Sequence, residues 1–244
     1  MKKVLAIALA MAMLSIMAVS GTLSYFTSTD GQANIMAVGN VQIEQLEMRR
    51  NGNSYEAFAP TKLYPYTGNG TPVDGWLKTE ENAVDKIVTI KNTGSEDAFI
   101  RTLFAFEAVM DSQGNPTDPV GTTILVNYNT NTAVGEWKKL DVNPIEITKT
   151  VNGVEVTTSY YVYSFTYTNA LAANASYASD PSLKQIALNG AAGNNFSGGS
   201  YDILVLSQAV QAQGFGDNVA AAFTAAFPIT AEKLVEWFAS IPTP

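Results

Sequence analysis

One stretch decides the fold class: Ile145-Glu-Ile-Thr-Lys-Thr-Val151, Asn152-Gly153, then Val154-Glu-Val-Thr-Thr-Ser-Tyr160. Two runs of alternating β-branched and polar residues flank an Asn-Gly pair. Asn and Gly both tolerate a positive φ, so this pair favours a type I′ turn between antiparallel strands. The pattern continues through Tyr161-Val-Tyr-Ser-Phe-Thr-Tyr167 and predicts a long strand after the turn.

Strand patterns continue on both sides of this hairpin. Val41 to Glu44, Asp85 to Lys91 and Tyr201 to Ala212 are rich in β-branched and apolar residues. The run from Ala98 to Val109 is almost continuously apolar, which predicts a strand buried on both faces. Many strands separated by Gly- and Asn-rich turns predict an all-β protein, a jelly-roll-like β-sandwich.

Helical patterns appear only near the end of the chain. The Ala-rich run from Asp217 to Phe227 predicts one helix, and Thr230 can cap a second helix that ends near Ser240. We therefore expect a jelly-roll-like β domain over residues 26–216 and a short helical C-terminal appendage over residues 217–244.

Residues 1–25 have the pattern of a signal peptide. Lys2 and Lys3 precede an apolar run without charge. The uncharged stretch from Val4 to Phe26 is long enough to span a bilayer, but its last part holds the small residues of a cleavage region, and cleavage is the favoured alternative over a retained anchor. The sequence does not decide which peptide bond is cleaved, because Ala18-Val-Ser20 and Thr22-Leu-Ser24 both fit a cleavage site. We expect a mature N-terminus between Gly21 and Phe26, contact with a membrane only through the signal before cleavage, and a secreted product.

The composition excludes several classes of chemistry. The chain has no His and no Cys, so it can form neither a Ser-His-Asp triad, nor an HExxH zinc site, nor a disulfide framework. Its formal net charge of −8 disfavours binding to nucleic acid phosphates. We expect no enzyme activity, no catalytic residues and no cofactor.

Three segments resemble one known family. Thr22-Leu-Ser-Tyr-Phe-Thr-Ser-Thr-Asp30, followed by Asn34 and by Val38-Gly-Asn-Val-Gln-Ile43, is similar to the start of TasA/camelysin-like proteins. These are secreted Gram-positive proteins with a SipW-dependent type of signal peptide. Val88-Thr-Ile-Lys-Asn-Thr-Gly-Ser-Glu-Asp-Ala-Phe-Ile-Arg101 resembles a strand, turn and strand of that family, and Ser207-Gln-Ala-Val-Gln-Ala-Gln-Gly-Phe215 resembles its late strand.

The resemblance implies a jelly-roll domain, export by a dedicated signal peptidase, and residence in an extracellular matrix, such as that of a biofilm, or on the cell surface. Some members assemble into fibres in which the N-terminal segment of one subunit completes the sheet of the next. The family name also carries a metalloprotease label, for which this chain lacks the His residues.

The segment from Phe26 to Glu47 is therefore the candidate assembly strand. It could pair within its own domain, the alternative favoured for an isolated monomer, or with a neighbouring copy in a fibre. In an extended segment, Ala33, Ile35 and Ala37 share one face, and Met36 and Val38 share the other. The residues expected to carry assembly are Phe26, Ala33, Ile35, Met36, Val38, Val41 and Ile43.

For three other groups of residues, a structural role is favoured over a functional one. Asp111, Asn115 and Asp118 offer oxygen ligands with calcium-like spacing, but they miss the EF-hand pattern and fit an ordinary turn. Arg101 lies in an apolar strand and predicts a structural salt bridge. The group from Tyr160 to Tyr167 could form a sugar platform, but cross-strand packing is the simpler account.

Three functions remain open after these observations. The first is a structural subunit of an extracellular matrix or cell-surface fibre that associates with copies of itself. The alternative is a surface-displayed binding or adhesion module that uses loops at 51–83, 111–123 and 189–200. A camelysin-type metalloprotease is the third and least favoured.

Overall fold

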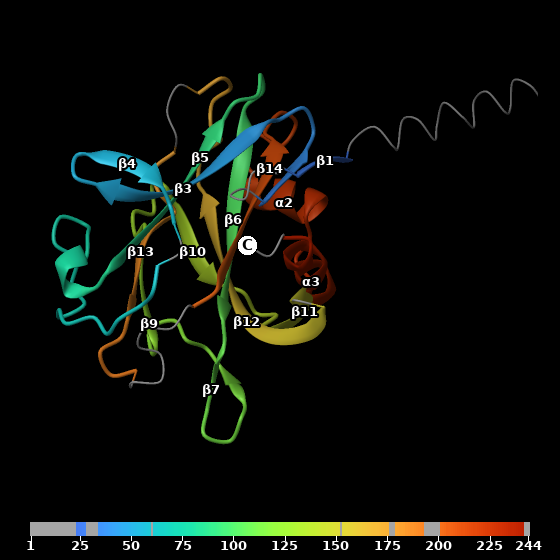
Figure 1. Ribbon diagram of the computed structural model, residues 1–244. Coiled ribbons are helices and arrows are strands. Elements are labelled where there is room, and N and C mark those ends of the chain that lie inside the picture. The colour runs from blue at the N-terminus through green and yellow to red at the C-terminus, as the bar shows by residue number, and fades with distance from the viewer. Residues whose placement is uncertain are drawn as a thin grey trace, which may run out of the picture.

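The computed structural model describes residues 23–27, 34–59, 61–151, 153–175, 179–192 and 201–241. Most of the predicted signal and Asn152 of the predicted turn lie outside the described residues. Two β-sheets pack face to face, and two short C-terminal helices cover the outer face of one of them (Figure 1). The prediction of an all-β protein with a short helical C-terminal appendage is confirmed.

The first sheet has seven strands, and its neighbours pair antiparallel with one exception. The exception is the parallel pair β2–β14 near one edge. At the other edge, β10 and β11 pair with different halves of β12. In spatial order, the strands are β1 (Leu23–Thr27), β2 (Asn34–Val38), β14 (Ile203–Gln211), β6 (Ala98–Glu107), β12 (Val154–Tyr167) and β10 (Gly135–Lys139); β11 (Ile145–Val151) also pairs with β12.

The second sheet has five strands, all antiparallel to their neighbours. In spatial order they are β4 (Ser54–Ala57), β3 (Ile43–Asn51), β5 (Val84–Asn92), β13 (Leu183–Leu188) and β9 (Ile124–Tyr128). A small hairpin of β7 (Val109–Met110) and β8 (Pro116–Thr117) extends from one end of the molecule (Figure 1).

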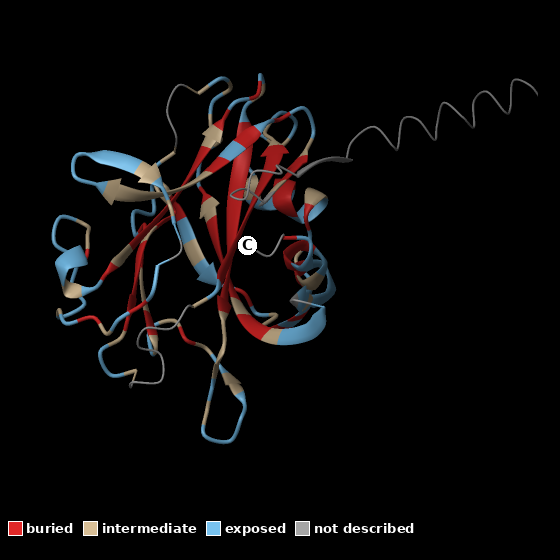
Figure 2. Cartoon of the chain, in the orientation of Figure 1, coloured by how far each residue is buried: buried red, intermediate tan, exposed pale blue. Residues whose placement is uncertain are grey.

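The central strand β6 explains why two apolar layers can exist. Nine of its ten residues are buried, which confirms the strand predicted to be buried on both faces (Figure 2). Ile100, Phe104 and Phe106 point into the core between the sheets, while Phe99 and Leu103 point toward the helices. This division follows from the two-residue repeat of a strand.

The helical appendage closes the second layer. Helix α2 (Val219–Ala226) begins one residue after Asn218, whose side chain accepts a hydrogen bond from the Ala221 N–H. Helix α3 (Ala231–Ala239) is capped by Thr230, as predicted. The two helices bury a cluster of apolar side chains against the sheet: Phe223, Phe227, Leu234, Trp237 and Phe238.

The predicted hairpin is present. Strands β11 and β12 pair from Ile145 opposite Tyr160 to Val151 opposite Val154. Gly153 has a φ of 80°, in the left-handed region that the predicted turn requires.

The loop predicted at 51–83 is wrong at its start, because β3 extends to Asn51 and Ser54–Ala57 forms β4. The described residues from 58 to 83 are mostly irregular, apart from the 3-10 helix η1 (Thr79–Glu81). Tyr66, Leu77 and Ala83 pack with Ala187 of β13, so this segment covers the outer face of the five-stranded sheet. Within the described part of the chain, no helix has both the length and the apolar character needed to cross a bilayer.

Candidate assembly site

The predicted assembly segment forms three elements in two sheets. Strand β2 lies between β1 and β14 of the seven-stranded sheet, with Asn34 opposite Leu206 and Val38 opposite Val210. Strand β3 instead belongs to the five-stranded sheet. The single strand expected from Phe26 to Glu47 is therefore wrong, and Val41 and Ile43 belong to the core between the sheets rather than to the same strand as Met36.

The break occurs at Gly39. Its φ of 92° is left-handed, and a Cβ there would lie 2.8 Å from Cβ of Gln211. The side chain of Gln211 accepts a hydrogen bond from the Asn40 N–H. The Gln42 carbonyl accepts hydrogen bonds from the N–H groups of Thr93 and Gly94, which hold the start of β3 on the other sheet.

The two-faced character predicted for this segment is confirmed over β2. Ala37 is buried in the core between the sheets, and Ile35 packs against that core. Met36 is buried in the cluster beneath the helices, and Val38 packs against it. Ala33 lies outside the described residues, and only the backbone of Phe26 is described.

Strand β14 presents polar side chains in the stretch next to β2. On the inner face, Ser207 donates a hydrogen bond of 2.6 Å to Gln45 Oε1 on the opposite sheet. The hydroxyls of Ser207 and Thr102 lie 3.1 Å apart. These three residues are buried. The contact joins the two sheets beside the β2 slot, which we define as the edge of β14 from Leu206 to Val210.

The polar chain continues away from β2 to an ion pair. Gln45 Nε2 donates a hydrogen bond to Glu47 Oε1, and Glu47 Oε2 lies 2.5 Å from Lys86 Nζ. Lys86 is also 4.4 Å from the ring centroid of Phe58. A buried charge is tolerated only when it is paired, and here the two charges satisfy each other.

On the outer face, Arg101 contacts neutral acceptors and an aromatic ring. Its guanidinium donates to Gln208 Oε1 and to the Phe227 carbonyl, and lies 4.6 Å from the Phe223 ring centroid. Among the described residues, no carboxylate forms an ion pair with Arg101. The predicted salt bridge is therefore wrong. Burial lowers the pKa of Arg101 to about 10, because desolvation disfavours its charged form.

The calcium candidates divide between two local structures. Asp111 accepts hydrogen bonds from the Gln113 N–H, the Asn115 N–H and the Asn115 amide, which lowers the pKa of Asp111. Asp118 instead pairs with Lys139 and accepts from the Tyr163 hydroxyl. In the described residues, no group of three or more His, Cys, Asp or Glu side chains is arranged to hold a metal ion.

The tyrosine group is split between the two layers. Tyr160 is buried in the cluster beneath the helices, whereas Tyr161, Tyr163 and Tyr167 face the core between the sheets. Phe104 and Phe106 lie opposite Tyr163 and Tyr161 on the neighbouring strand. Cross-strand packing is therefore the observed arrangement, and these four rings do not share one face.

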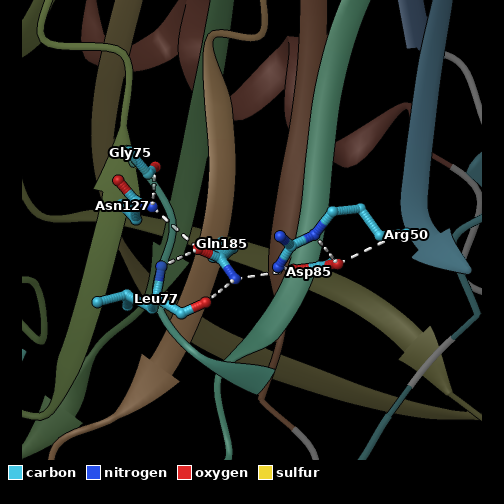
Figure 3. Close-up of polar contacts among 6 residues, drawn as sticks. All are labelled: Arg50, Gly75, Leu77, Asp85, Asn127 and Gln185. Carbon is cyan, nitrogen blue, oxygen red and sulfur yellow. Dashed lines mark hydrogen bonds and ion pairs between the residues drawn. The ribbon is translucent and has the colours of Figure 1, made fainter. Parts of the chain in front are cut away.

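A second polar network lies on the outer face of the five-stranded sheet (Figure 3). Arg50 makes two side-chain hydrogen bonds to Asp85, of 2.7 and 2.8 Å. Asp85 in turn accepts from Gln185, which also bonds to Asn127 and to the backbone of Leu77. Sequence reasoning missed this network; the signal was Gln185, a polar residue inside the short strand Leu183–Leu188 whose neighbours Ile186, Ala187 and Leu188 are apolar.

Comparison of the chain with models of protein families, with curated proteins and with solved structures finds no match.

Proposed function

We propose that this chain is a secreted structural subunit of an extracellular matrix or cell-surface fibre, which assembles when β2 of one copy occupies the β2 slot of the next. The observation that carries the proposal is the position of β2. It is a five-residue strand near the edge of its sheet, it pairs parallel with β14, and a turn at Gly39 separates it from β3.

Removal of the signal would leave β2 closer to the edge. Strand β1 pairs with β2 through Leu23 opposite Val38, Ser24 opposite Ala37 and Tyr25 opposite Met36. Cleavage after Tyr25 would remove all three of these pairs. Strand β2 would then keep β14 as its principal partner, and an edge strand with one partner is easier to exchange than a central one.

The polar side chains of the slot support exchange because most of their hydrogen bonds do not involve β2. Ser207 bonds to Gln45 and Thr102, and Gln208 bonds to Arg101. When β2 leaves, these bonds remain, Gln208 loses only the weak contact of its amide nitrogen with the Met36 sulfur, and the exposed edge consists chiefly of backbone N–H and C=O groups. A strand of the same sequence from a neighbour would satisfy that edge again.

The finer description of the fold and the family belongs to the same proposal. We propose a jelly-roll-like sandwich of the TasA/camelysin-like type, exported by a signal peptidase and free of catalytic activity. The alternation of the chain between the two sheets, with β2, β6, β12 and β14 in one and β3, β5, β9 and β13 in the other, supports it. The parallel β2–β14 pair departs from a purely antiparallel sandwich.

Deleting residues 26–38 from the mature protein tests the proposal. We expect a folded domain that no longer polymerises, because the strands from Val84 onward supply most of the buried apolar surface. Electron microscopy measures polymerisation, and circular dichroism measures folding. A synthetic peptide of residues 33–43 should bind the truncated domain, and the same peptide with Ala37→Asp should bind weakly, because Ala37 is buried in the core.

Each contrary outcome has a distinct meaning. Normal fibres from the truncated protein would show that donor-strand assembly is wrong. Failure of the truncated protein to fold, even with the peptide present, would show that β2 is an integral strand of its own domain. Monomers of the intact mature protein under every condition, including with cell-surface material present, would remove the fibre proposal.

The binding module remains a second candidate because large apolar side chains are exposed in one predicted loop. Tyr55, Tyr64 and Val73 lie within residues 51–83 and are 57%, 49% and 58% exposed. Replacing all three with Ser should abolish adhesion to isolated cell-surface material if this loop binds it. Unchanged adhesion would remove this candidate. Cleavage of casein that a chelator abolishes, and that survives repurification, would instead revive the metalloprotease.

A further inference from the structure

Arg101 is a buried cation whose contacts in the described part of the chain are with neutral groups, and it lies where the C-terminal helices meet the strand next to β2. It extends from β6 beneath α2 and is 7% exposed. Its donors reach Gln208 on β14 and the carbonyl of Phe227, the residue that ends α2. A single side chain thus ties the end of α2 to the β2 slot.

The contact with Arg101 also orients Gln208 toward β2. The guanidinium of Arg101 donates two hydrogen bonds to Oε1 of Gln208, from Nε at 3.0 Å and from a terminal nitrogen at 2.5 Å. The amide nitrogen of Gln208 therefore faces the opposite way, where it lies 3.9 Å from the sulfur of Met36. Met36 belongs to the same apolar cluster as Phe223, Phe227 and Trp237 of the helical appendage.

We propose that Arg101 and Gln208 form a latch that holds α2 over the outer face of β2 and thereby sets the rate at which β2 leaves its slot. The inference rests on the proposed function and adds the regulation of the same site. Loosening α2 removes packing from Met36 and Val38, and the strand then opens more often. Tightening α2 has the opposite effect.

The latch acts on rate more than on the final extent of assembly. In strand exchange, the incoming residues 34–38 are identical to the outgoing ones, so the latch makes the same contacts in the monomer and in the fibre. Its contribution to the two end states largely cancels. The intermediate with an empty slot lacks the packing of Met36 and Val38, so the latch affects the barrier.

Thiol labelling of the monomer measures opening of β2 directly. The chain has no Cys, so Ala37→Cys introduces a single thiol at a position that is 6% exposed. Ala187→Cys, in the five-stranded sheet and fully buried, reports opening of the rest of the domain. The ratio of the two labelling rates isolates β2 from global unfolding.

Two latch variants should move this ratio in opposite directions. Arg101→Met keeps the length of the side chain but removes its donors, and should raise Ala37→Cys labelling about tenfold relative to Ala187→Cys. Arg101→Lys should restore part of the difference. Gln208→Glu gives Arg101 an anionic partner and should slow labelling severalfold. Arg49→Met, which breaks an exposed ion pair with Glu56, should leave the ratio unchanged.

Fibre growth of the same variants, without the reporter thiols, separates this inference from the proposed function. Arg101→Met should shorten the lag before fibres appear, and Gln208→Glu should lengthen it. An unchanged labelling ratio in Gln208→Glu, which retains all the packing of the core, would overturn the latch even if Arg101→Met fails to fold. Altered labelling with unaltered growth rates would overturn its role in regulation. Altered labelling without any fibres would instead contradict the proposed function and leave the latch in place.

Discussion

The side-chain amide of Gln185 pairs with both backbone groups of Leu77. Its Oε1 accepts a hydrogen bond of 2.6 Å from the Leu77 N–H, and its Nε2 donates one of 2.9 Å to the Leu77 carbonyl. The side chain of Gln185 therefore satisfies the backbone N–H and carbonyl of an irregular segment, as the backbone of a neighbouring strand would. Gln185 is fully buried, so every one of its hydrogen bonds forms away from water.

Replacing Gln185 with Leu should destabilise the protein strongly. The change leaves the Leu77 N–H and carbonyl, the Asn127 amide and one Asp85 oxygen without this partner. We expect a loss of about 2 to 5 kcal/mol in the free energy of unfolding, measured in urea. Gln113→Leu, at an exposed position in the β7–β8 loop, serves as the control and should change it by less than about 0.5 kcal/mol.

Breaking the ion pair inside the sandwich should cost more than breaking one at the surface. Glu47→Gln leaves Lys86 without its anion at a site where the side chains of the pair are 15% and 8% exposed. We expect a loss of about 3 kcal/mol. Glu56→Gln breaks the solvent-exposed pair with Arg49, whose side chains are 39% and 43% exposed, and should cost much less, because water screens the two charges. Equal losses in chemical denaturation would contradict this account.

A side chain at Gly39 should disturb the turn between β2 and β3. Gly39→Ala forces a Cβ against Gln211 and places a non-glycine residue at a φ of 92°. Gly114→Ala is the matched control, because Gly114 has a φ of 82° but no atom within 4 Å of the added carbon. We expect the Gly39 variant to lose about 1 to 2 kcal/mol more than the control in thermal unfolding. Similar losses would mean that Gln211 moves aside without cost.

Stability should depend on pH through Glu107. Burial raises the pKa of Glu107; the Asp202 N–H partly opposes this, and the Asp202 carboxylate adds to it. The folded protein therefore holds this proton to a higher pH than the unfolded chain does. The contribution of Glu107 is fully present below its unfolded pKa, about 4.3, and is lost as the pH rises through the raised folded value.

The variant Glu107→Gln removes this titration. We expect it to melt at a higher temperature than the unmodified protein at pH 7, with the difference shrinking toward pH 4. Glu136→Gln, at an exposed position of β10, should show no such trend. A Glu107→Gln protein that is less stable at pH 7, with no change in the difference toward pH 4, would contradict the sign of this prediction.

The order of polar and apolar residues was enough to predict the strands and helices whose formation depends on residues close to them in the sequence. The β11–β12 hairpin follows from alternation around Asn-Gly, the burial of β6 from its continuous apolar run, and α3 from Thr230 followed by Leu234 and Trp237. The candidate site was predicted in part: the two faces of β2 follow from the two-residue repeat, and they are apolar on both sides.

The sequence by itself determined the class of structure and the two-faced character of β2. Because it lacks His and Cys, it also excluded a Ser-His-Asp triad, an HExxH zinc site and disulfides. Only the tertiary structure decided which strands are neighbours. The parallel β2–β14 pair joins segments about 170 residues apart, Arg101 finds neutral partners rather than a carboxylate, and Gln185 bonds to a residue 108 positions away. Such contacts depend on how two whole sheets face each other, and no local repeat or propensity encodes that arrangement.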